Sequence, residues 1–141
     1  PSVFKNSAAT PEQAATHGDA CEIVFDSPKL GRCRILFTMV NGKETAVRYR
    51  QKDDGTVSAE VVDVGFGVRR FDSDYALQAT VPWKVLGINR KETESIRFDF
   101  GVLRSNSEGT ETERINRWAG RTIEDTRTAA GIWQVRGELE F

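Results

Sequence analysis

The residues best suited to chemistry in this chain are a tryptophan and the polar side chains just before it. Trp118 follows Arg114, Asn116 and Arg117 closely in the sequence. An indole ring can stack on the apolar face of a sugar, and guanidinium and amide groups can hydrogen-bond its hydroxyls. On an extended strand Arg114, Asn116 and Trp118 would share one face, whereas Arg117 would join them only if the strand bulges or ends before it. These residues, with Trp133 as a second wall, predict a carbohydrate-binding site; the alternative is that both tryptophans pack in the core.

The short segment 72–74 has a spacing that suits metal ligands. Asp72 and Asp74 flank Ser73. Calcium takes six to eight oxygen ligands from flexible loops, so two carboxylates here could contribute to a structural calcium site. The alternative is a solvated turn, since Asp and Ser are common turn residues. No zinc site is predicted, because one histidine and two separated cysteines cannot supply four ligands at a usual spacing.

The sequence lacks the motifs of common catalytic machineries. It contains no Gly-x-Ser-x-Gly motif and no phosphate-binding loop. His17, the only histidine, lies in a polar opening segment without a nucleophile motif around it. Asp99 stands between two phenylalanines, and its neighbours Arg97 and Gly101 indicate that it points outward. We therefore expect a non-catalytic chain, which could be attached to a glycoside hydrolase or another enzyme.

Length and charge narrow the range of partners. A chain of 141 residues suits one domain with one core. The formal net charge of -1, from 20 basic and 21 acidic residues, gives no electrostatic reason to expect nucleic acid or an anionic membrane as a partner. No stretch approaches the roughly 20 apolar residues of a membrane span. Because the chain begins at Pro1 rather than at Met, we expect residues 1–141 to be a single domain from a larger protein.

Apolar and polar residues alternate with a period of two from residue 20 onward, which predicts strands with one buried face. Asn41-Gly42 is a strong hairpin signal because both residues tolerate a positive φ. Short strands separated by turns predict an all-β fold, an antiparallel two-sheet β-sandwich of the jelly-roll kind rather than an immunoglobulin-like one. The expected strands are 20–26, 33–39, 45–50, 57–64, 75–81, 96–102 and 133–141, with a further strand ending at Trp118.

Three other segments carry local signals. Residues 2–19 are polar and rich in turn formers, which predicts a long loop. Pro82 should end a strand because it cannot donate a hydrogen bond. Residues 83–86 should form one helical turn closed by Gly87. In that position Trp83 should plug one end of the sandwich.

The two cysteines lie on the first two predicted strands. If these strands form a hairpin that turns near residues 27–31, Cys33 faces Phe25 rather than Cys21, beyond the usual bridging distance. We therefore expect two reduced, half-buried thiols.

Four segments together resemble the family 9-like carbohydrate-binding modules of large secreted bacterial proteins. They are GDACEI at 18–23, YALQATVPWKVLG at 75–87, the strand 96–105 with DFGV at 99–102, and RW at 117–118. The resemblance implies a jelly-roll sandwich that binds sugars through aromatic residues, often with structural calcium, in an extracellular or cell-surface protein, with the periplasm as the alternative compartment. Two features depart from the family: strands that usually precede the Gly-Asp segment are missing, and GIWQ at 131–134 replaces its usual closing motif.

Two rival functions remain open. An incomplete sandwich could be a structural or interaction module that is completed by strand addition within an extracellular assembly. Some related sandwich domains bind haem between a methionine and a histidine or lysine, and Met39 is the only methionine here. A Soret band in the purified protein would reveal haem.

Overall fold

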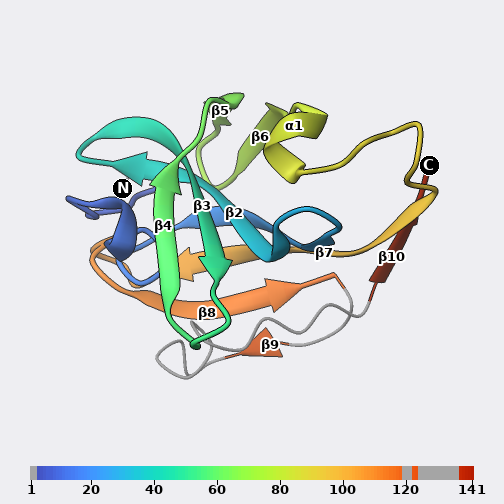
Figure 1. The fold of residues 1–141 in the computed structure, drawn as a ribbon. Coiled ribbons are helices and arrows are strands. Elements are labelled where there is room, and N and C mark those ends of the chain that lie inside the picture. Colours follow the sequence, from blue (N-terminus) through green and yellow to red (C-terminus); the bar gives the residue numbers. More distant parts are fainter. Residues whose placement is uncertain (1–2, 119–121, 124–136) are drawn as a thin grey trace.

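The computed structural model describes residues 3–118, 122–123 and 137–141, and most of these residues lie in strands. Figure 1 shows one large sheet with a smaller layer, made of two strands and a helical turn, on one side of it. The elements in chain order are η1 (Pro11–Gln13), β1 (Ala20–Ser27), β2 (Gly31–Val40), β3 (Lys43–Gln51), β4 (Val57–Val61), β5 (Gly65–Arg70), β6 (Tyr75–Thr80), α1 (Trp83–Leu86), β7 (Ser95–Ser105), β8 (Thr112–Arg117), β9 (Thr122–Ile123) and β10 (Gly137–Glu140).

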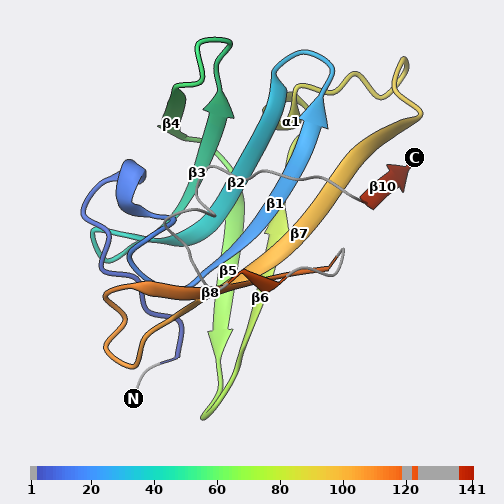
Figure 2. The ribbon, with the colours of Figure 1, turned by 90° about the horizontal axis from the view of Figure 1, so that it is seen from below.

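The large sheet is antiparallel. Its strand order is β4-β3-β2-β1-β7-β8-β9, and β10 pairs with β7 beyond the end of β8. Figure 2 shows β4, β3, β2, β1 and β7 side by side in that order. The second sheet contains β5 and β6 alone among the described residues. The prediction of an all-β, antiparallel two-sheet sandwich is confirmed.

The large sheet buries side chains on both faces. On the face toward β5, β6 and α1, here called the hairpin face, the core includes Phe25, Ile35 and Phe37. The ring of Phe37 meets Phe66 of β5 edge to face, with centroids 5.6 Å apart. The buried residues of this face alternate along β1 and β2 with those of the opposite face. The period-two pattern therefore located the strands, but the expectation that only one face is buried was wrong.

The opposite face is covered by the N-terminal segment, and we call it the N-terminal face. Ala8, Ala14 and Ala15 pack there with residues of β1, β2, β3, β7 and β8. The Tyr49 hydroxyl donates a hydrogen bond to the Pro11 carbonyl oxygen at 2.5 Å. The segment predicted as a loop is therefore largely irregular, but it contains η1 and completes part of the core. Its contacts make it a structural layer of the fold.

Local turn signals predicted the hairpins correctly. Asn41 and Gly42 have φ values of 50° and 73° and join β2 to β3. Ser27 pairs with Gly31, and Cys33 lies opposite Phe25, as expected from the predicted turn. Both cysteines are free thiols, and burial raises the pKa of each of them.

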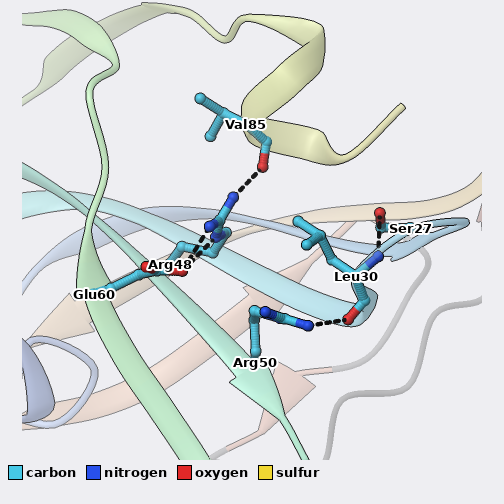
Figure 3. Close-up of polar contacts among 6 residues, drawn as sticks. All are labelled: Ser27, Leu30, Arg48, Arg50, Glu60 and Val85. Carbon is cyan, nitrogen blue, oxygen red and sulfur yellow. Dashed lines mark hydrogen bonds and ion pairs between the residues drawn. The ribbon is translucent and has the colours of Figure 1, made fainter. Parts of the chain in front are cut away.

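Two arginines of β3 bind main-chain carbonyls: Arg48 fastens the second layer to the large sheet, and Arg50 fastens the β1–β2 turn (Figure 3). Arg48 donates to the Val85 carbonyl oxygen of α1 at 2.6 Å and also pairs with the Glu60 carboxylate of β4. Arg50 donates to the Leu30 carbonyl oxygen in the β1–β2 turn at 3.3 Å. These bonds satisfy main-chain carbonyls at two corners of the molecule, where the strand ladders end.

The helical turn forms where predicted, but its tryptophan does not plug the sandwich. Gly87 closes α1 with a left-handed φ of 65°. Trp83 is 44% exposed, contacts Phe141 edge to face at 5.0 Å and lies beneath the Arg90 guanidinium. The expectation that Trp83 is a buried plug was therefore wrong. The side chains of α1 that enter the core are Val85 and Leu86.

Candidate functional site

The polar residues predicted to act together lie along β8. Arg114, Asn116 and Trp118 alternate along the strand, so they share its hairpin face. Their cross-strand neighbours belong to β7: Arg104 lies opposite Arg114, and Val102 lies opposite Asn116. The pairing continues one step further, because the Trp118 N–H donates to the Phe100 carbonyl oxygen at 2.9 Å. We call these six residues of β7 and β8 the strip: Phe100, Val102, Arg104, Arg114, Asn116 and Trp118.

Two aromatic rings form one end of the strip. Phe100 and Trp118 are stacked, with ring centroids 5.7 Å apart and an angle of 15° between the planes. Phe100 is 45% exposed and Trp118 is 59% exposed. The Phe100 ring packs against one face of the indole, which leaves the other indole face as an exposed apolar surface. Such a surface fits the C–H face of a sugar ring.

Phe100 was not predicted as a site residue. Its alternation with Asp99 and Gly101 is typical of a residue on a buried strand face. It is exposed because the second sheet covers the large sheet only in part: Phe98, two residues earlier on the same face, packs against the core, and Phe100 does not. No local pattern in the sequence contains this information, since it depends on how many strands the second layer has.

Arg117 lies on the other side of β8. Its side chain is buried in the N-terminal face, where its Nε donates to the Glu22 carboxylate at 2.8 Å. Arg34 pairs with the other oxygen of the same carboxylate. Burial opposes the ionisation of Glu22 most strongly, but the two arginines hold its pKa below the usual value. Arg117 is therefore part of a buried ionic triad and is directed away from the strip.

No pattern in the sequence indicated this triad, and the predicted position of a nearby carboxylate was also wrong. Glu22 and Arg34 were expected to point to solvent, yet each is 1% exposed. Asp99 was expected to face outward and is 2% exposed. All three lie on the N-terminal face of the large sheet. The buried charges are therefore separated from the strip by the sheet itself.

A pocket of about 380 Å³ adjoins the arginine end of the strip. Phe4 and Tyr75 meet edge to face in its wall, with centroids 4.8 Å apart. Asp19 also lines the pocket, but its two carboxylate oxygens accept the backbone N–H groups of Lys5 and Ser105, each at 2.8 Å. Asp19 thus holds two backbone segments together. The polar and charged residues around the pocket include Lys5, Ser73, Asp74, Arg104, Asn106 and Ser107.

The residues expected to bind calcium are at the tip of the β5–β6 hairpin. Asp72 and Asp74 are both exposed, and Asp74 accepts a hydrogen bond from the Ser73 hydroxyl at 3.4 Å. Among the described residues, no group of three or more His, Cys, Asp or Glu side chains could hold a metal ion. Two exposed carboxylates supply too few of the oxygens that calcium requires. The calcium site stays a prediction for which the described residues offer no third carboxylate.

Three other predictions concern Trp133, haem and membrane insertion. Trp133, the expected second wall, lies outside the described residues. Met39 is half-buried in β2, and the His17 Nδ1 atom lies 2.8 Å from the Thr16 hydroxyl oxygen. Haem binding through Met39 stays a prediction. Within the described part of the chain, no helix is long and apolar enough to cross a membrane.

The strip and the adjoining pocket together can hold an elongated polar ligand. The aromatic pair offers an apolar face, and the amide and guanidinium groups along β8 offer hydrogen bonds. Arg104 lies four positions after Phe100, which corresponds to about 13 Å along a strand. Comparisons of the chain with protein-family models, with curated proteins and with solved structures found no match.

Proposed function

We propose that this chain is a non-catalytic carbohydrate-binding module of a secreted or cell-surface protein. The observation that carries the proposal is the stacked, solvent-exposed pair of Phe100 and Trp118. Two adjacent exposed rings offer an apolar surface that a ligand or partner can cover. A sugar covers such rings while its hydroxyls remain hydrogen-bonded, and Asn116 and Arg114 lie next along the strand.

The non-catalytic part of the proposal rests on where the buried carboxylates lie. Glycoside hydrolysis needs two carboxyl groups on either side of the scissile bond. The Glu22 carboxylate forms ion pairs with two arginines. Glu22 and Asp99 both lie on the N-terminal face of the sheet. A glycan on the strip would touch the hairpin face. We therefore expect binding without cleavage.

Calorimetry against a panel of plant and algal polysaccharides and their oligosaccharides tests this function. Replacing Trp118 or Phe100 with alanine should weaken binding about tenfold or more, because each ring contributes on the order of 1–2 kcal/mol to the stacked surface. Phe71→Ala is the matched control, since Phe71 is also exposed, at 48%, but lies on the β5–β6 hairpin. The proposal fails if no glycan binds, or if the three variants bind equally well.

A second candidate is an interaction module that is completed by strand addition. It is favoured by the unequal layers of the sandwich: the second sheet has two strands in the described part of the chain, so β5 and β6 each leave one edge unpaired. Unpaired edges can accept a strand from another chain.

Sedimentation over a range of concentrations, combined with amide hydrogen exchange, separates the two candidates. Strand addition between copies would slow exchange in β5 or β6 as the concentration rises. Glycan binding would instead slow exchange in β7 and β8 at constant mass. A monomer whose β5 and β6 amides exchange freely at every concentration would count against self-association.

A further inference from the structure

The large sheet ends at β4, whose outer edge has no partner strand among the described residues. Figure 2 shows β4 beyond β3 at this end of the sheet. Edge strands usually carry a proline, a lysine or a bulge that discourages pairing with another chain. Residues 57–61 contain neither proline nor lysine, and their register with β3 is regular. The edge of β4 is therefore open to a further strand.

Two main-chain hydrogen bonds define which residues of β4 point outward. The Val62 N–H donates to the Ala46 carbonyl oxygen at 3.0 Å, and the Lys52 N–H donates to the Thr56 carbonyl oxygen at 2.8 Å. Bonded and non-bonded residue pairs alternate along an antiparallel ladder, so the even-numbered residues of β4 bond to β3. The N–H and C=O groups of residues 57, 59 and 61 therefore point to the free edge.

The sequence of β4, VSAEV, suits pairing with a second copy of itself. A two-fold axis at Ala59 would place the two Ala59 residues opposite each other and each Val57 opposite Val61 of the other copy. Because these residues have outward main-chain groups, each of the three pairs can exchange two hydrogen bonds. Val57 and Val61 are 47% and 61% exposed, and the pairing would bring them into contact.

The polar residues of β4 are complementary in the same register, which places each Glu60 opposite Ser58 of the other copy. Arg48 binds the Oε1 atom of Glu60 through Nε at 3.0 Å and Nη2 at 2.6 Å. The Oε2 atom of Glu60 and the Ser58 hydroxyl make no hydrogen bond within the described residues. A serine hydroxyl can donate to a carboxylate across a strand pair. An unpaired donor and an unpaired acceptor thus face each other on both sides of the axis.

We propose that two copies of this chain associate through β4, in an antiparallel register centred on Ala59, so that their large sheets join into one. The interface is isologous, since the same five residues of each copy pair with each other. Five residues a side make a small interface, so the association should be weak. This inference does not depend on the carbohydrate-binding function, because the strip lies on β7 and β8, beyond β3, β2 and β1 in the sheet.

Sedimentation equilibrium from micromolar to millimolar concentration, with amide hydrogen exchange on the same samples, tests the proposal. The average mass should rise from that of one chain towards that of two. The outward amides of Val57, Ala59 and Val61 should exchange about tenfold more slowly when about 90% of the chain is dimeric, because exchange then proceeds through the remaining monomer. The inward amides of Ser58 and Glu60 should be protected at every concentration.

Charge variants test the register. The double variant Val57→Lys/Val61→Lys would place lysines opposite each other, so it should remain monomeric, and Val57→Glu/Val61→Glu should do the same. An equimolar mixture of the two should recover the dimer, because each lysine then faces a glutamate. Phe71→Lys is the control, since Phe71 is 48% exposed on the β5–β6 hairpin and should leave association unchanged. Thermal unfolding of each variant confirms that the fold is retained.

Three results would overturn the proposal. The first is a constant mass up to millimolar concentration, with exchange in β4 that does not depend on concentration. The second is association that protects β5 or β6 and leaves the outward amides of β4 unprotected. The third is a lysine double variant that dimerises like the wild type, or a mixture of the two double variants that stays monomeric.

Discussion

The two faces of β8 use the same residue types for different purposes. On the N-terminal face, Arg117 is 8% exposed and shares the Glu22 carboxylate with Arg34. On the hairpin face, three residues away, Arg114 is exposed and stands opposite another arginine. The difference arises from what covers each face, since the N-terminal segment packs over one and the two-stranded second sheet only partly covers the other. Burial makes Arg117 part of an ionic triad inside the fold, whereas the side chain of Arg114 remains at the surface.

The largest effect that separates the two faces should come from removing the shared carboxylate. Glu22→Gln would leave Arg34 and Arg117 buried without their anion, so the free energy of unfolding should fall by about 3–5 kcal/mol. Chemical denaturation measures this change. Glu113→Gln, an exposed carboxylate on β8, is the control and should change stability by no more than about 0.5 kcal/mol. Equal changes in the two variants would mean that the triad does not stabilise the fold.

The same carboxylate should make stability depend on pH. The pKa of folded Glu22 is lowered relative to the ordinary value of 4.5, so the ion pairs contribute fully above that value. Their contribution is lost as the pH falls below 4.5 and through the pKa of the folded state. Urea denaturation between pH 7 and pH 3 should therefore show the wild type and Glu22→Gln becoming more alike at low pH. A difference that stays constant over this range would contradict the assignment.

A smaller effect is expected at the exposed aromatic cluster next to α1. Trp83→Ala removes an edge-to-face contact with Phe141 and the cation–π contact with Arg90, which together amount to about 1–2 kcal/mol. Phe25→Ala, at a fully buried position, should cost about 3–5 kcal/mol. Thermal unfolding of the two variants compares them directly. If Trp83→Ala were as costly as Phe25→Ala, the indole would be a core residue after all.

The sequence predicted the fold through patterns that are local. Alternation located the strands, the Asn41-Gly42 pair defined a hairpin, and Gly87 closed the helical turn. It also placed Arg114, Asn116 and Trp118 on one strand face, because that grouping depends only on the period of two.

The features that the sequence did not predict depend on long-range packing. The alternating pattern predicts that Glu22 and Arg34 face solvent. No residue near them in the sequence indicates that the N-terminal segment packs over their side of the sheet. The sequence pattern predicts that Phe100 and Trp83 are both buried. Each would be buried if the second layer were wider. The second sheet has two strands among the described residues, and no local pattern shows which strands join which layer.

The most direct test of the account is the solvent exposure of the three tryptophans with and without glycan, measured by fluorine NMR on 5-fluorotryptophan-labelled protein. Single tryptophan-to-phenylalanine variants assign the resonances. We predict that the Trp118 resonance shows a clear H₂O/D₂O isotope shift in the free protein and loses it when the best-binding glycan saturates the site, while the Trp83 resonance is unchanged by the ligand. A Trp118 resonance that is already shielded in the free protein, or that keeps its isotope shift in the complex, would contradict the claim that this ring is the sugar-binding surface.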